Sequence, residues 1–89
     1  MPMHEASLTN DLVRKMVEIA KSENAGRVVR AEVWLGALSH MSPDHFKEHF
    51  KVSSVGSLAE GAELVIETSD DIAHSEAQSI LLRRIETED

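Results

Sequence analysis

Apolar residues recur every three or four positions in the first quarter of the chain, which is the spacing of a helix with one buried face. These residues are Leu8, Leu12, Val13, Met16, Val17, Ile19 and Ala20. Ser7 suits an N-cap or a first turn, and Asn24-Ala25-Gly26 is typical of a helix end, because Gly26 can adopt the left-handed conformation. The pattern predicts a helix from about Ser7 to Asn24 that packs into the core.

The next segment, Val28 to Leu35, has the two-residue period of a strand. One set of alternate residues is uniformly apolar and is expected to face the helices: Val29, Ala31, Val33 and Leu35. The other set is mixed, so its face is expected to be open: Val28, Arg30, Glu32 and Trp34. Trp34 either packs against long aliphatic side chains, which is the commoner case, or lies in an exposed strip that marks an interface.

A second helix is predicted from Ser42-Pro43-Asp44 to about Ser53. Ser42 can cap the helix, proline fits its first position, and an acidic residue favours its positive end. Phe46 and Phe50, four residues apart, are expected to anchor it.

Two more strands are predicted, Ala62 to Thr68 and Ser79 to Glu86, separated by the polar loop Ser69–Gln78. Apolar residues fall on both faces of the last strand: Ile80, Leu81, Leu82 and Ile85. This two-sided pattern indicates that its second face is partly covered, and a homodimer is one way to cover it.

Composition limits the classes of function. The chain has 89 residues, which predicts one small domain over residues 1–89 with a modest core. It contains no cysteine, so disulfides and thiolate metal sites are excluded. The net charge of −7 argues against nucleic-acid binding and favours the attraction of cations. No apolar run approaches a membrane span or a signal-peptide core, so the cytoplasm is the default location.

Pro2-Met3-His4-Glu5 is the first candidate for metal chemistry. Removal of Met1 would leave Pro2 as a free amine with an imidazole two residues further on. That amine, the Met3 and His4 amide nitrogens and the His4 ring can surround one ion in a plane, which is the geometry that Ni(II) and Cu(II) prefer.

Other candidate ligands are weaker, and nothing indicates an enzyme. His45 and His49 are four residues apart and could bind a metal, with His40 as a third ligand, although a solvated helix face is commoner. The loop carries Asp70, Asp71, His74 and Glu76, but such a run is more often a solvated loop. No phosphate-binding loop, Gly-x-Ser-x-Gly turn or ordered catalytic triad is present.

Four ordered blocks of the sequence resemble one known family. Met3-His4-Glu5-Ala6-Ser7-Leu8 resembles the N-terminal signature of the HypA/HybF-type hydrogenase nickel-incorporation proteins. Val33–Ser39 is similar to the family's strand and Gly-x-Leu-Ser turn. Pro43-Asp44 with Phe50, and then Gly56–Leu64, match the following blocks in the same order.

The resemblance implies an α+β fold, a mixed three-stranded sheet with two helices on one face, in the order helix-strand-helix-strand-strand. It also implies a metallochaperone that delivers Ni(II) to the [NiFe] hydrogenase large-subunit precursor, and sometimes to urease, alongside a maturation GTPase. Nickel in the family is held at the Met-His-Glu terminus, which corresponds to Met3, His4 and Glu5.

The sequence departs from the family in two places. The family carries a zinc module of two Cys-x-x-Cys pairs between its last two strands, whereas the cysteine-free segment 69–78 takes that place here, so no structural zinc is expected. Met1-Pro2 also precede the family start, which moves the metal-binding amine to Pro2. The alternative to a chaperone is a metal-free interaction module that acts through its open sheet face or as a dimer.

Overall fold

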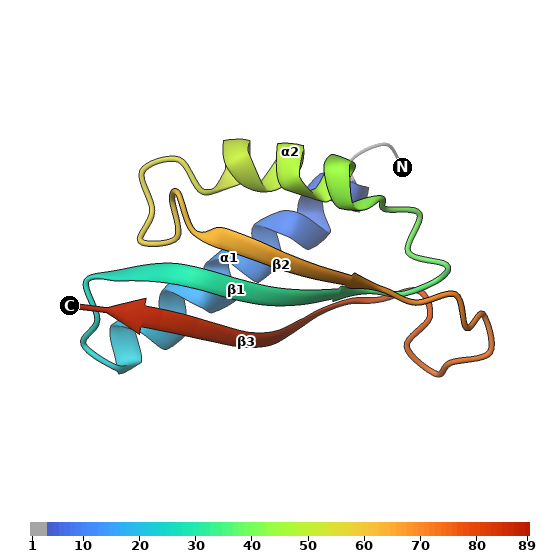
Figure 1. The fold of residues 1–89 in the computed structure, drawn as a ribbon. Helices are drawn as coiled ribbons and strands as arrows, with labels where there is room; N and C mark the ends of the chain where they lie inside the picture. The colour runs from blue at the N-terminus through green and yellow to red at the C-terminus, as the bar shows by residue number, and fades with distance from the viewer. Residues whose placement is uncertain (1–3) are drawn as a thin grey trace.

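The computed structural model describes the backbone of residues 4–89 and the side chains from Ser7 onward. Its elements in chain order are α1 (His4–Ser22), β1 (Arg27–Leu35), α2 (Pro43–Ser53), β2 (Glu63–Thr68) and β3 (Ile80–Glu88) (Figure 1). The expected α+β fold is confirmed: both helices pack on one face of a mixed three-stranded sheet.

β1 is the central strand of the sheet, whose order is β2-β1-β3. It pairs in parallel with β2, from Arg30 opposite Glu63 to Leu35 opposite Thr68, and the crossover between these two strands contains α2. On its other side β1 pairs antiparallel with β3. The segment that joins β2 to β3 therefore passes the end of β1, next to Trp34 and Leu35.

α1 differs from its prediction at both ends. It begins at His4 rather than near Ser7. At its other end the Asn24 N–H donates to the Lys21 carbonyl at 3.0 Å and the Ala25 N–H donates to the Ala20 carbonyl at 2.9 Å. These bonds form a Schellman end, and Asn24 takes the left-handed conformation with φ 57°. The expectation that Gly26 would take that conformation is wrong.

Two β-bulges shift the alternation of the strands. The first lies between Val28 and Arg30 of β1, and it places Val28 in the core, against the prediction that Val28 faces outward with Trp34. The prediction is correct for Ala31, Val33 and Leu35, which are all buried with the helices.

The second bulge lies in β3 and leaves Arg83 without an opposite residue on β1, because Glu32 pairs with Arg84 and Val33 pairs with Leu82. Three of the four apolar residues of β3 then pack with the helix-side core: Ile80, Leu82 and Ile85. The two-sided pattern of β3 is therefore produced largely by the bulge.

The core lies between the helices and the sheet. Its largest fully buried side chains are Phe46 and Met16, one from each helix, with Leu35, Val28 and Val33 from β1. Within residues 4–89, no helix is long and apolar enough to cross a membrane.

Candidate functional site

The N-terminal metal site of the sequence analysis lies largely outside the described part of the chain. Pro2 and Met3 are outside the described residues, and for His4 and Glu5 only the backbone is described, as the first turn of α1. The first four N–H groups of a helix have no carbonyl partner within it. The His4 nitrogen can therefore bind a metal without the loss of a helical hydrogen bond, and the four-nitrogen site stays a prediction.

α2 holds two of the other candidate ligands in a fixed arrangement. The Ser42 hydroxyl accepts from the His45 N–H at 3.2 Å, as the predicted N-cap, and Phe46 and Phe50 are buried beneath the helix. The His45 and His49 rings lie 5.4 Å apart between centroids, with 43° between their planes.

The three-histidine metal site that would add His40 to this pair is not formed. Among the side chains that the structure describes, no three or more His, Asp or Glu residues come together to hold a metal. His40 lies in the connector before α2 in the left-handed conformation, with φ 60°, and is exposed.

The polar side chains of segment 69–78 shape the loop itself. Asp71 Oδ1 accepts from the Ala73 N–H at 3.0 Å, and His74 Nδ1 accepts from the Glu76 N–H at 2.9 Å. Glu76 Oε1 accepts from the Ser79 hydroxyl at 3.0 Å. The candidate ligands of this loop therefore act as local hydrogen-bond acceptors, which agrees with the loop interpretation.

The same loop covers Trp34. The His74 ring lies 5.0 Å from the Trp34 ring, and the Arg83 guanidinium carbon lies 5.5 Å from its centroid. Trp34 is only 4% exposed, so the prediction that it lies on an open face is wrong, and the packing interpretation is confirmed. This burial removes Trp34 from the surface that the metal-free interaction module would use.

Farther along this outer face, charged side chains pair across the strands. Arg30 of β1 contacts Glu63 of β2 and Glu86 of β3, both at 3.3 Å. Arg84 lies 3.7 Å from Glu32 and 3.5 Å from Glu86. Exposed pairs of this kind contribute about 0–1 kcal/mol each, so they mark a hydrated surface more than a source of stability.

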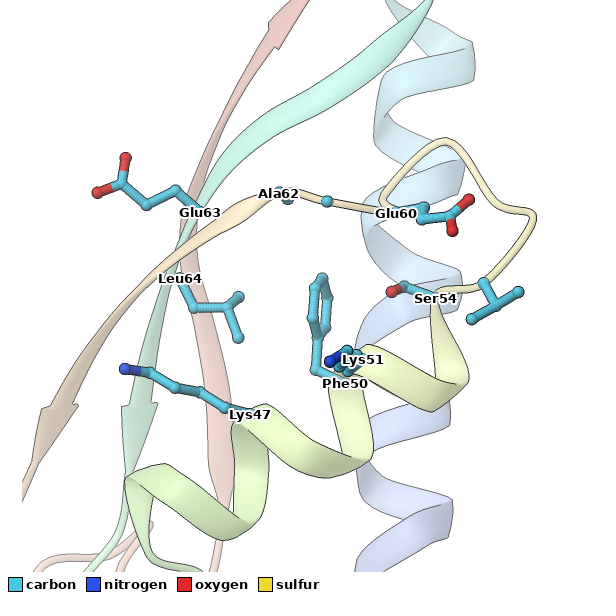
Figure 2. A pocket seen from close by; sticks show the side chains of 10 residues that line it. Lys47, Phe50, Lys51, Ser54, Glu60, Ala62, Glu63 and Leu64 are labelled. Atoms are coloured by element: carbon cyan, nitrogen blue, oxygen red, sulfur yellow. The ribbon is translucent and has the colours of Figure 1, made fainter.

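Sequence reasoning missed a cleft of about 650 Å³ between α2 and the edge strand β2. Figure 2 shows Phe50 and Leu64 pointing into this space from opposite sides, with Lys47 reaching from α2 toward β2. The turn between α2 and β2 forms one end of the cleft, and Gly56 and Gly61 in that turn have positive φ angles of 78° and 79°. The sequence feature that could have indicated this cleft is the pair of lysines Lys47 and Lys51, which are four residues apart and lie on either side of Phe50 in the sequence.

Comparisons with known proteins agree with the resemblance in the sequence. Residues 3–77 match the family described as hydrogenase/urease nickel incorporation, metallochaperone, hypA. A hydrogenase maturation factor HypA from Chlorobium limicola is 40% identical over 65 residues, which cover 73% of this chain and 56% of that protein. The one from Chlorobaculum tepidum is 35% identical over 75 residues, which cover 84% and 66%. The chain thus spans about half to two thirds of the length of the curated relatives it matches.

Solved structures share the fold. The solution structure of the Ni metallochaperone HypA from Helicobacter pylori superposes with a TM-score of 0.79 and 20% identity, covering 94% of this chain and 97% of that one. A second HypA solution structure gives a TM-score of 0.69. The family match over residues 3–77 and the curated relatives agree with each other: this chain belongs to the HypA family of hydrogenase/urease nickel-incorporation proteins.

Proposed function

We propose that this protein is a nickel metallochaperone that acts in the maturation of [NiFe] hydrogenase, or of urease. The observation that carries the proposal is the family match, which extends over residues 3–77 and names nickel incorporation. On this proposal the chain works in the cytoplasm with a maturation GTPase and transfers Ni(II) to the hydrogenase large-subunit precursor. The proposal includes no structural zinc of the Cys-x-x-Cys type, because residues 1–89 contain no cysteine.

The proposed nickel site is the segment from Pro2 to Glu5. The Pro2 amine, the Met3 and His4 amide nitrogens and the His4 imidazole supply the four planar ligands, and the Glu5 carboxylate lies next to them in sequence. Two features support this placement. α1 begins at His4, where helical N–H groups have no internal acceptor, and the chain carries a net charge of −7.

Such a site suits transfer as well as binding. The amine, amides and imidazole must lose protons to bind the metal, so acidification releases the ion. Cu(II) binds the same ligands more tightly than Ni(II), so selection of nickel depends on metal supply and on the partner proteins.

The test is a Ni(II) titration, by calorimetry and by the absorbance of planar Ni(II), of protein whose N-terminal Pro2 has been verified by mass spectrometry. Removing a residue that only hydrogen-bonds to a metal ligand usually lowers metal affinity by about 10- to 100-fold. His4→Ala removes a ligand itself, so we expect it to lower the affinity for Ni(II) by at least about 100-fold. His40→Asn is the matched control, because it removes an exposed imidazole from a position whose left-handed backbone asparagine tolerates.

Two results would contradict the proposal. One is a wild-type protein with a free Pro2 amine that takes up no nickel at neutral pH. The other is a planar nickel site that keeps its full affinity in His4→Ala.

A further inference from the structure

β2 forms one edge of the sheet and lies next to α2 (Figure 1). Just beyond β2, the Ser69 N–H donates to the Leu35 carbonyl of β1 at 3.0 Å. Backbone N–H groups point alternately to the two sides of a strand, so those of Leu64 and Ile66, an odd number of positions before Ser69, point away from β1. Among the described residues, no group outside the sheet pairs with them. β2 therefore offers a free edge to which an extended chain can add.

The cleft between α2 and β2 lies beside this edge. Phe50 and Leu64 point into it from opposite sides (Figure 2). Val55, at the end of the cleft, is 66% exposed. The cleft volume of about 650 Å³ is within the range of about 300–1,000 Å³ that is usual for ligand pockets. An apolar side chain of a strand added to β2 can therefore enter the cleft.

The cleft is cationic, although the chain has a net charge of −7. Lys47 and Lys51 line it from α2, and among the described residues neither lysine forms an ion pair. The two carboxylates that line the cleft have partners of their own: Glu60 accepts from a backbone N–H of its turn at 3.1 Å, and Glu63 lies 3.3 Å from Arg30. The two ammonium groups therefore favour an anionic occupant.

We propose that the cleft and the free edge of β2 bind an extended acidic segment of a partner protein, which adds to the sheet as a fourth strand. One apolar side chain of the segment enters the cleft between Phe50 and Leu64. Carboxylates two residues away lie on the same face of the added strand and contact the two lysines. A second copy of this chain is a poorer occupant, because it also carries −7 and its β2 presents Glu63 and Glu67.

The probe is the acetylated and amidated heptapeptide Thr-Asp-Thr-Val-Thr-Asp-Thr, added to the full chain without metal, so that the result is independent of the proposed nickel site. Its side-chain order is the same in both directions, so it suits parallel and antiparallel pairing. As a strand it places the valine and both aspartates on one face. The control peptide carries lysine in place of each aspartate. We expect the acidic peptide to bind at least about 10-fold more tightly than the lysine peptide, because the latter meets like charges.

Hydrogen exchange, followed by NMR in the unmodified chain, tests the backbone pairing. At saturating acidic peptide we expect slower exchange at the Leu64 and Ile66 amides, whose N–H groups point to the free edge. The Val65 amide points toward β1 and is the internal control, with an unchanged exchange rate. Because this measurement needs no substitution, it does not depend on how a variant folds.

Charge reversal of the two lysines tests the electrostatic part. Lys47→Glu with Lys51→Glu is expected to weaken binding of the acidic peptide by at least about 10-fold and to strengthen binding of the lysine peptide, because attraction and repulsion exchange places. Lys15→Glu with Lys21→Glu is the matched control: it makes the same change of charge on α1, at residues that do not line the cleft, and keeps the preference for the acidic peptide. Circular dichroism verifies that both variants keep their helices.

The proposal is overturned if the acidic peptide does not bind at millimolar concentration, if the two peptides bind equally well, or if the Leu64 and Ile66 amides exchange as fast with the peptide as without it. Protection of these amides in the free protein would also overturn it. Loss of that protection on dilution would identify a second copy as the occupant, and protection at every dilution would identify a segment of this chain.

Discussion

Asn24 ends α1 in the left-handed conformation, with φ 57°. For a residue with an ordinary Cβ this conformation costs about 1–2 kcal/mol, whereas asparagine tolerates it and glycine adopts it freely. We therefore expect Asn24→Ala to lower the free energy of unfolding by about 1 kcal/mol, with Asn24→Gly neutral or stabilising. Urea unfolding of the two variants measures the difference, and equal midpoints for both would contradict it.

The choice between Asn24 and Gly26 could not be made from the local sequence, because both residues suit a left-handed helix end. The structure shows why glycine is needed two positions later: a Cβ on Gly26 would lie 2.8 Å from the Asp89 carbonyl carbon. That contact comes from the far end of the chain. Sequence reasoning found the right segment for the helix end and missed the residue.

At the scale of elements, the contact between the connector after β1 and the loop before β3 depends on Gly36. Its N–H donates to the Ser79 carbonyl at 2.9 Å, and the Leu38 N–H donates to the Ala77 carbonyl at 2.7 Å. A Cβ on Gly36 would lie 2.2 Å from the Ala77 carbonyl oxygen, which is backbone and cannot turn aside as a side chain could.

We expect Gly36→Ala to destabilise the protein by about 1–3 kcal/mol, the usual cost of an overpacked site. The entropic gain from replacing glycine, about 0.4–1 kcal/mol, is smaller and does not offset it. Urea unfolding gives the free energy, and hydrogen exchange at the Leu38 amide shows whether the loop has lifted. Ala37→Ser, one residue away, is the control. Unchanged stability of Gly36→Ala would refute this close contact.

The elements themselves were largely predictable, because hydrophobic period and capping residues are local signals. α2 was predicted from Ser42-Pro43-Asp44 with its correct bounds, and each strand was placed within two residues at either end. The bulges at Val28 and Arg83 were not predictable, because a bulge depends on the register against a strand more than fifty residues away. The sequence alone therefore could not predict which way Val28 and the apolar residues of β3 point.

At the scale of the whole molecule, the charge of −7 extends over a body of 39 × 23 × 19 Å. The screening length is about 30 Å at 0.01 M salt and about 8 Å at 0.15 M. At low salt the full charge therefore attracts Ni(II), whereas at physiological salt only nearby carboxylates do.

We expect the association rate of Ni(II) to fall between these two salt concentrations while the dissociation rate stays nearly constant, because the field acts on approach more than on the formed bonds. Stopped-flow absorbance measures both rates. The control is a charge-reduced variant, Glu60→Gln with Glu67→Gln, whose association rate should depend less on salt. An association rate independent of salt would contradict long-range attraction.

The candidate sites were predictable to different degrees. The N-terminal segment and the pair His45 and His49 were visible as residue types at fixed spacing. The cover over Trp34 was not, because it is supplied by His74 and Arg83 from segments about forty and fifty residues later. The cleft was missed because its two sides come from α2 and β2.

Trp34 is the only tryptophan in the chain, and it lies beneath segment 69–78, the loop that joins β2 to β3. The protein therefore carries an intrinsic fluorophore at the junction of that loop with the sheet. Its emission reports whether the loop is seated, because lifting His74 would admit water to the indole and move the emission to longer wavelength. Release of the loop by a partner protein could thus be followed in unlabelled protein, in real time.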